Sequence, residues 1–311
     1  MTSTESLIRD YVSFKQALGF DFAGEARRLN AYLEYSDGAP LTVELALEWA
    51  CSGPGHPRSY QAQRYETVRR FSSFAHSLDR TAIALPPGIL GKTDDRVVPY
   101  IYSDEDVAIL MNCARGLKSP DGLRGESLAF LLGLMRSCGL RVSEALGVCD
   151  ADFHESELSL DVRESKFGTS RTIAVQPDVM QHVRGYQELR DSALRGRAPG
   201  KTIVSTGGKP LTRDSAEGMF SEIRWALLPR GASFEGRMPR LHDARHTFAT
   251  ATILRWHEEG ADVNAMIPYL SAYLGHKKLS DTYWYLTGVP QLLDVAAESF
   301  RSMGFGGDGD D

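Results

Sequence analysis

The sequence lacks a long apolar run, a cysteine framework and a nucleotide-binding glycine loop. No run of 18 apolar residues occurs in the 311 residues, so a membrane-spanning helix is not expected. The four cysteines form no C-x-x-C pair and are too few for a disulfide scaffold, which favours a reduced, cytoplasmic protein. A Walker-type G-x-x-x-x-G-K-[ST] segment is also missing, so ATP-driven chemistry is not indicated.

The chain also has no basic surplus, since 41 acidic residues stand against 35 basic ones. A net charge of −6 argues mildly against a nucleic-acid partner, although binding needs a basic face rather than a basic total. One such local surplus exists, because residues 56–80 hold five arginines against two acidic residues. A solvated helix face is the simplest interpretation of that cluster.

What the chain does contain is ordinary globular composition, with 42% apolar and 24% charged residues, and its length suggests two domains. Apolar residues at helical spacing fill the first 80 residues, and Pro86-Pro87-Gly88 then breaks the pattern. We therefore predict a helical domain over residues 1–85, a linker over 86–102 and a second domain over 103–311.

The second domain combines many helices with one hairpin. Residues 158–163 alternate apolar and polar side chains, residues 172–175 read as a second strand, and Lys166 lies in the turn between them. The predicted fold class is mainly α with a small β-hairpin or sheet. Its remaining helices are expected at about 177–192, 213–228, 241–257, 263–273 and 290–302.

Three segments carry side chains suited to chemistry. In the first, Gly139 permits a helix break, and Arg141 and Glu144 then share one helix face. A buried ion pair explains that segment equally well. In the second, His242-Asp243-Ala244-Arg245-His246 places two histidines four residues apart, as in some zinc sites. An arginine between the two ligands would repel a dication, so we predict no metal site.

The third segment, Leu274-Gly275-His276-Lys277-Lys278, suggests a helix start that meets an anion, and Tyr283-Trp284-Tyr285 follows it. Aromatic residues at such a place are core packing by default. Taken together, the three segments suit a phosphodiester: arginine forks match its oxygens, histidines move protons, a lysine can protonate the leaving oxygen, and a tyrosine can be a covalent nucleophile.

On these residues the chain resembles the tyrosine recombinases, or phage integrases. Gly139–Glu144, His242–Thr250 and Leu274–His276 are similar to the family's three boxes, and Tyr285 follows His276 by the usual nine residues. The resemblance implies a site-specific DNA recombinase that works through a 3′-phosphotyrosyl link and a Holliday junction, without metal, ATP or other cofactor. It also implies that a helical core-binding domain and the catalytic domain form a C-shaped DNA clamp.

The resemblance also implies a role for each site residue. Arg141 and Arg245 would clamp the scissile phosphate, and His242 and His276 would hydrogen-bond it or assist proton transfer. Glu144 would orient the active-site cations. Tyr285 would be the nucleophile, with Tyr283 a competitor in principle, and Lys166 would be the acid, although its turn is less basic than in many relatives. The residues expected to contact DNA are Arg64, Arg69, Arg70, Lys277 and Lys278.

The implied partners are double-stranded DNA with paired sites and further copies of the chain, as a tetramer on DNA. An apolar face for a neighbouring protomer could come from Leu292, Leu293, Ala296 and Phe300, and packing of these residues within their own chain is an equal alternative. Two alternatives remain within the same fold: a type IB topoisomerase, which relaxes DNA, and a DNA-binding relative that has no activity.

Overall fold

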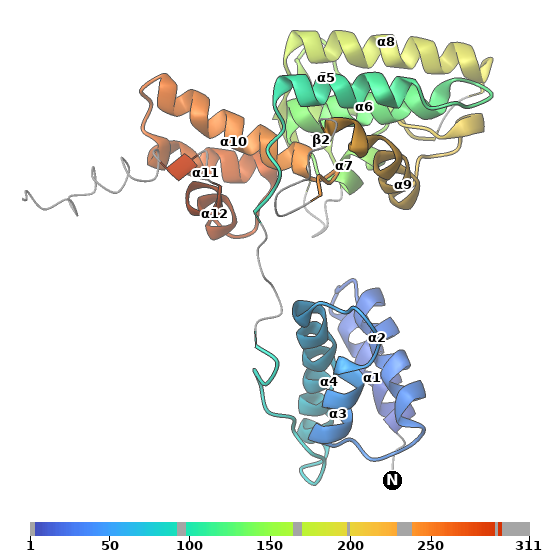
Figure 1. Cartoon of the computed structure of the whole chain (residues 1–311), viewed down its shortest axis with the longest axis vertical. Coiled ribbons are helices and arrows are strands. Elements are labelled where there is room, and N and C mark those ends of the chain that lie inside the picture. Colours follow the sequence, from blue (N-terminus) through green and yellow to red (C-terminus); the bar gives the residue numbers. More distant parts are fainter. Residues whose placement is uncertain are drawn as a thin grey trace, which may run out of the picture. The chain divides into compact units, whose positions relative to one another are not determined.

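The computed structural model describes residues 4–91, 98–163, 170–197, 200–228, 238–289 and 292–293. The chain divides into two compact units, residues 1–97 and residues 98–311, each with its own hydrophobic core (Figure 1). None of the described helices is both long and apolar enough to cross a bilayer.

The first unit is a bundle of four helices, as the apolar spacing predicts. The longest helix, α4, contacts each of the other three, and buried aromatic side chains such as Tyr32, Trp49 and Phe71 fill the space between them. Thr42 caps α3 by accepting a hydrogen bond from the Leu45 backbone N–H at 3.1 Å. The helices are α1 (Thr4–Ala17), α2 (Ala23–Ser36), α3 (Val43–Cys51) and α4 (Arg58–Leu78).

Both ends of the predicted linker pack against protein. Leu90 belongs to the core of the first unit, and the Tyr65 hydroxyl donates to the Pro86 carbonyl at 2.9 Å. Tyr102 belongs to the core of the second unit, where its backbone N–H donates to Thr247 Oγ1 at 3.0 Å. Residues 92–97, in the middle of the predicted linker, lie outside the described residues.

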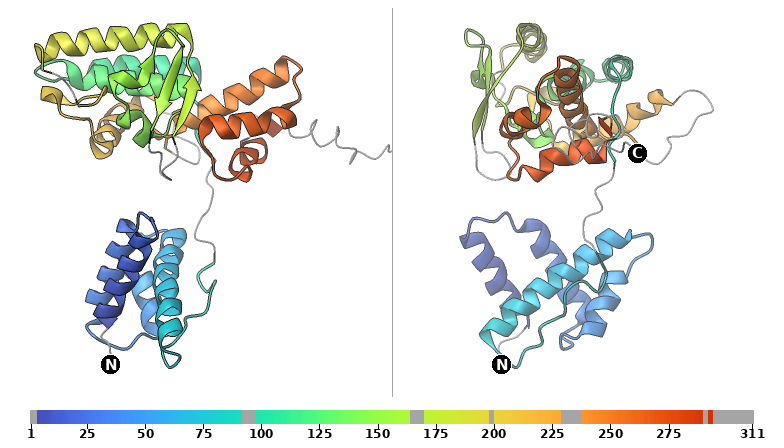
Figure 2. Two further views of the ribbon diagram at one scale, coloured as in Figure 1. Left: turned by 180° about the vertical axis from the view of Figure 1, so that it is seen from behind. Right: turned by 90° about the vertical axis from the view of Figure 1, so that its left-hand side faces the viewer.

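The second unit holds the remaining elements (Figure 2). The prediction of a mainly helical chain with a small antiparallel sheet is confirmed. Its elements are α5 (Asp104–Arg115), α6 (Leu123–Cys138), α7 (Val142–Gly147), η1 (Asp150–Asp152), β1 (Phe153–His154), β2 (Ser159–Val162), β3 (Arg171–Ala174), α8 (Pro177–Leu194), η2 (Thr206–Gly208), α9 (Arg213–Ile223), η3 (Arg224–Leu227), α10 (Asp243–Glu258), α11 (Val263–Leu274) and α12 (Ser280–Gly288).

The three strands run in the order β1-β2-β3, and β2 pairs with β3 from Ser159↔Ala174 to Val162↔Arg171. Two of these strands match the predicted hairpin, whereas β1 has only two residues and leaves no pattern to read. The prediction gave no range for α12, although the segment from Gly275 to Lys278 indicated a helix start close to it. Apart from residues 292–293, the predicted helix over 290–302 lies outside the described residues.

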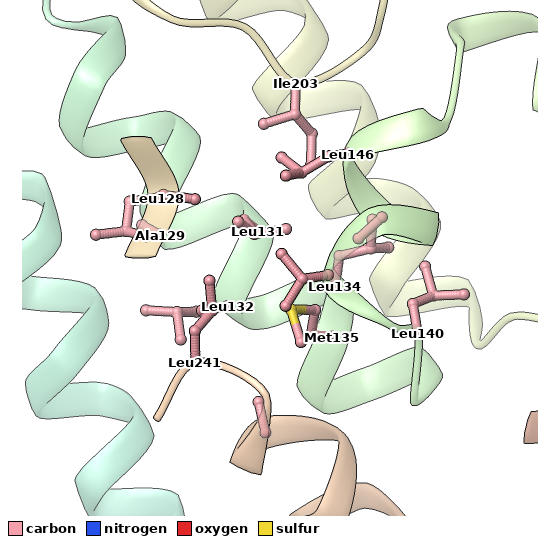
Figure 3. Close-up of a cluster of buried hydrophobic side chains, with 14 of the residues drawn as sticks. Leu128, Ala129, Leu131, Leu132, Leu134, Met135, Leu140, Leu146, Ile203 and Leu241 are labelled. Carbon is pink, nitrogen blue, oxygen red and sulfur yellow. The ribbon is translucent and has the colours of Figure 1, made fainter. Parts of the chain in front are cut away.

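Helix α6 is the centre of the second unit. It is buried on several sides and contacts α5, α8 and α10. Leu128, Leu131 and Met135 point from α6 into the core, where Leu241 and Ile203 meet them from other segments (Figure 3). Because α6 ends beside α10, the residues that follow α6 lie next to α10 and the end of α11, which carry the second and third boxes.

Candidate active site

The break between α6 and α7 brings the boxes together. Gly139 ends α6 with a φ of +61°, in the left-handed region that favours glycine. A Cβ atom on Gly139 would lie 2.4 Å from the Phe248 ring of α10 and 2.9 Å from Leu274 at the end of α11. Glycine therefore allows these helices to approach, and Arg141 follows at the N-terminus of α7.

Two arginines meet at the C-terminal end of α11. Arg141 donates to the Gly275 carbonyl at 2.9 Å, and Arg245 donates to the Leu274 carbonyl at 2.7 Å. Arg245 is 2% exposed and also donates to the Gly139 carbonyl at 2.8 Å. The last carbonyls of a helix lack partners within the helix and carry partial negative charge, so they hold cations. Burial lowers the pKa of Arg245 to about 10, which leaves it charged at neutral pH.

Glu144 binds these arginines from inside the protein. Its Oε1 accepts from Arg141 Nη1 at 2.6 Å, its Oε2 accepts from the Arg141 backbone N–H at 3.0 Å, and Arg245 Nη1 lies 3.6 Å from Oε2. Burial opposes ionisation of this carboxyl, but hydrogen bonds from Arg171 and Arg141 outweigh it and lower the pKa of Glu144 to about 2. Glu144 is therefore a fixed negative charge behind two cations.

Three histidines surround the arginines as neutral groups. Burial is the main cause that lowers the pKa of His242 to about 4 and that of both His246 and His276 to about 3. The charge of Arg245 contributes to each of these shifts. At pH 7 the three rings are neutral and can accept or donate hydrogen bonds. One ring nitrogen of His276, Nδ1, is hydrogen-bonded to Thr282 Oγ1 at 2.7 Å.

Tyr285 lies inside α12 with its ring stacked near His276, at 6.5 Å between centroids, and is 2% exposed. Its hydroxyl is hydrogen-bonded to Nδ1 of His246 at 3.0 Å. The ring of Tyr283 packs against the apolar cluster formed by α10, α11 and α12. The tyrosine at the predicted spacing is thus the one whose hydroxyl reaches a histidine of the second box.

From the sequence, His246 is considered only as a zinc ligand and no role is assigned to Arg171, and the structure adds both residues to the site. The partner of His246 is 39 residues away in sequence, and helical spacing alone does not reveal such a contact. Arg171 begins β3 and donates both terminal nitrogens to Glu144, at 3.1 and 3.0 Å. Arg171 follows the turn of Lys166 closely in the sequence, and this position could have indicated that it belongs to the site.

A basic cavity of about 520 Å³ opens beside Arg141 and His242. Three further arginines line it, against one carboxylate, Glu217, which is itself ion-paired with Arg213 at 2.7 Å. Such a cavity suits an anion with several oxygens. The cationic residues of its wall are Arg141, Arg213, Arg224 and Arg240, with His242 beside them.

The residues expected to contact DNA differ in their surroundings. Lys277 and Lys278 are exposed directly after His276, as a DNA contact requires. Arg69 donates both Nε and Nη2 to Glu66 at 2.7 Å, and the more exposed Arg70 donates to the same carboxylate at 3.1 Å.

Arg64 does not fit the expected contact. It is 8% exposed, donates to the Ser52 carbonyl at 2.5 Å, and stacks over Trp49 at 4.2 Å. Arg64 is four residues before Val68 on the apolar stripe of α4, so helical spacing turns it towards the core. Its expected DNA contact is therefore replaced by a structural one. Lys166 lies outside the described residues, and its role stays a prediction.

Within the described ranges, no three histidine, cysteine or carboxylate side chains gather as metal ligands would. The two histidines of the zinc alternative have perpendicular rings 5.1 Å apart, and His246 is engaged with Tyr285.

The lowered histidine pKa values predict a loss of stability in mild acid. A histidine held neutral in the fold takes up a proton more readily when unfolded, so stability is lost as the pH falls from about 6.5 towards 4. Between pH 7.5 and 5.5, His242 alone should cost about 1 kcal/mol of unfolding free energy. Urea unfolding at both pH values should show a smaller pH difference in His242→Gln than in the wild type. Identical pH dependence in the two proteins would contradict the buried, neutral ring.

Comparison with known proteins places this geometry in one family. The profile of the phage integrase family matches residues 99–290. A candidate integrase/recombinase, y4rB of Sinorhizobium fredii, is 33% identical over 307 residues, covering 95% of this chain and 96% of its own. The tyrosine recombinase XerD of Mycobacterium tuberculosis is 28% identical over 237 residues, covering 74% of this chain and 70% of its own.

Solved structures share the fold at lower identity. The Tn1549 transposon integrase in complex with transposon right end DNA is similar with a TM-score of 0.68 and 17% identity, over 97% of this chain and all of that one. A lambda integrase tetramer bound to a Holliday junction is similar with a TM-score of 0.62 and 17% identity, over 89% of this chain and 78% of that one.

Proposed function

Because the chain belongs to the phage integrase family, we propose that the cluster around Arg141, Arg245 and Tyr285 is the active site of a site-specific DNA recombinase. The observation that carries the proposal is the meeting of two guanidinium groups at the end of α11, with the Tyr285 hydroxyl 3.0 Å from Nδ1 of His246, the residue that follows Arg245. Phosphate clamp and nucleophile thus share one site.

The chemistry is an in-line attack on a DNA phosphate. The Tyr285 hydroxyl oxygen bonds to phosphorus, the bond to the 5′ oxygen breaks, and a 3′-phosphotyrosyl link and a free 5′-hydroxyl result. The hydroxyl proton passes to Nδ1 of neutral His246, 3.0 Å away, and Lys166 gives a proton to the leaving oxygen. The new link keeps the energy of the phosphodiester, so the reverse attack rejoins DNA without ATP.

Fixed charges stabilise the transition state. Arg141 and Arg245 hold the non-bridging oxygens, with His242 and His276 as hydrogen-bonding partners, while Glu144 keeps the arginines oriented. Donors that are already in place do not have to reorganise as negative charge develops on the phosphate. These cations stabilise the negative charge of the transition state, as metal ions do in many other phosphoryl-transfer sites.

The proposed substrate is double-stranded DNA with paired recombination sites. Exchange between two sites needs four protomers, and the segment from Pro290 onward is the proposed contact between them. Leu293 is 54% exposed and is available for such a contact, whereas Leu292 is buried in the apolar cluster of its own chain. A cytoplasmic location follows from this substrate and agrees with four free cysteines.

The half-buried Arg69 and the exposed Arg70 of α4 are proposed to contact DNA phosphates. Replacing Arg69 and Arg70 together with alanine should weaken DNA binding and lower the slope of log affinity against log salt by about one or two. Each lost phosphate contact releases about one counterion fewer, which is the origin of that change. Gel-shift titrations at several salt concentrations measure it. An unchanged slope would show that both arginines form only their ion pairs with Glu66 and do not contact DNA.

The function is tested on a supercoiled plasmid in EDTA. Duplexes bound by Tyr285→Phe protein are first selected from a randomised DNA pool, and two copies of a selected duplex are cloned into one plasmid. The wild type should produce recombinant circles from this plasmid. Relaxed circles alone would identify a topoisomerase, unchanged plasmid would identify an inactive DNA-binding relative, and either result would contradict the proposal.

A further inference from the structure

Arg171 is an arginine of the site whose nitrogens are all committed to the protein. Its Nε donates to the Tyr273 carbonyl at 2.7 Å, and its two terminal nitrogens form a fork with the carboxylate of Glu144. The Arg171 side chain is 14% exposed and that of Glu144 is 1% exposed. An arginine that holds a buried carboxylate and a carbonyl at the end of α11 can act on the reaction through these neighbours.

The end of α11 is shaped around Arg171. Gly275 caps this helix with a φ of +67°, and a Cβ atom there would lie 2.7 Å from Arg171 Nη1. Three successive carbonyls then accept from three different arginines: Tyr273 from Arg171, Leu274 from Arg245 and Gly275 from Arg141. Arg171 therefore fixes the helix end on which the phosphate clamp rests.

Arg171 also fixes the carboxylate that balances the clamp. Both oxygens of Glu144 are shared between Arg171 and Arg141, so the fork from Arg171 sets the plane of the carboxylate. Without that fork, the carboxylate can turn towards Arg141 and neutralise more of the charge meant for the phosphate. The two effects act on the same group, the guanidinium of Arg141.

We propose that Arg171 is a positioning residue that holds Glu144 and the end of α11 so that Arg141 faces the scissile phosphate. This inference rests on the proposed function, because it concerns the same site. Arg171 also pairs with Val162, the pair of β2 and β3 residues nearest the turn. It therefore links the clamp to the strand that follows the turn of Lys166.

The test compares Arg171→Ala, Arg171→Lys and a control, Arg163→Ala. Arg163 follows β2 at the other side of the same hairpin, is 63% exposed and is ion-paired to Asp152 at 2.6 Å. Each protein cleaves a nicked suicide duplex of the selected sequence, once with a normal scissile phosphate and once with a methylphosphonate. The methylphosphonate lacks the non-bridging negative charge that the clamp binds.

On the normal phosphate, Arg171→Ala should cleave about 10–100-fold more slowly than the wild type, as loss of a supporting contact typically does. Arg171→Lys should show most of the same decrease in cleavage rate, because an ammonium group cannot form the two-pronged contact with the carboxylate. Arg163→Ala should cleave like the wild type. On the methylphosphonate the difference between wild type and both Arg171 variants should shrink to a few-fold, which general damage to the fold would not produce.

Wild-type cleavage rates in both Arg171 variants would overturn the inference, and so would equal losses on the two duplexes. If Arg171→Ala does not fold by circular dichroism, Arg171→Lys decides the question alone. A wild-type protein that cleaves neither duplex would contradict the proposed function itself, which separates the two failures.

Discussion

Replacing Tyr285 with phenylalanine is expected to abolish DNA cleavage while leaving DNA binding intact. The change removes one oxygen, the proposed nucleophile, and leaves the ring to fill its place among α10, α11 and α12. It also removes the 3.0 Å hydrogen bond to His246, a loss of about 1–3 kcal/mol of stability. Cleavage of a nicked suicide duplex, followed as a covalent protein–DNA band in denaturing gels, measures the effect.

Tyr283→Phe is the matched control, because it makes the same change two residues away in the same helix. It should form the covalent band at close to the wild-type rate. A covalent band formed by Tyr285→Phe, or loss of that band in Tyr283→Phe, would contradict the assignment of Tyr285 as the nucleophile.

Removing the arginine clamp should cost nearly as much activity. Arg141→Ala is expected to slow cleavage by about 10²–10³-fold, or roughly 3–4 kcal/mol of activation free energy, because preorganised donors act mainly on the transition state. DNA affinity should change far less, since many other phosphate contacts remain. Single-turnover cleavage and gel shift on the same duplex separate the two effects.

Arg245→Ala should lose activity too, but it also removes a buried cation with two carbonyl partners and should lower stability by several kcal/mol. Arg141 is therefore the cleaner test. Arg213→Ala is the comparison variant, since Arg213 lines the same cavity and its side chain is 66% exposed. It should affect binding more than cleavage. Near-normal cleavage by Arg141→Ala would refute the clamp.

Much of this site was predictable because its residue types suit a phosphodiester and because their order resembles that of the tyrosine recombinases. The order of arginines, histidines and tyrosine placed Arg141, Arg245 and Tyr285 in one site, and the structure brings them to the end of α11. The break at Gly139 was predictable too, since a glycine between two apolar helical runs is free to adopt a positive φ.

The rest depended on contacts that leave no periodic signal. The hydrogen bond between His246 and Tyr285 and the fork between Arg171 and Glu144 join segments 39 and 27 residues apart. A count of local charge could not tell that Arg64 binds a backbone carbonyl and an indole ring while Arg70 faces solvent. Helical spacing places Arg64 on the buried side of α4, but its particular partners are decided by tertiary packing.

The central claim is that Tyr285 forms a covalent bond to DNA inside this arginine cluster, and one measurement tests it most directly. Wild-type protein is incubated in EDTA with the suicide duplex, the trapped complex is digested with trypsin and nuclease, and the modified peptide is fragmented in a mass spectrometer. Trypsin cuts after Lys278 and Arg301, so residues 279–301 form one peptide that holds both Tyr283 and Tyr285. The account predicts a nucleotide adduct on Tyr285. An adduct on Tyr283 or on another residue, or no adduct until a divalent metal is added, would contradict it.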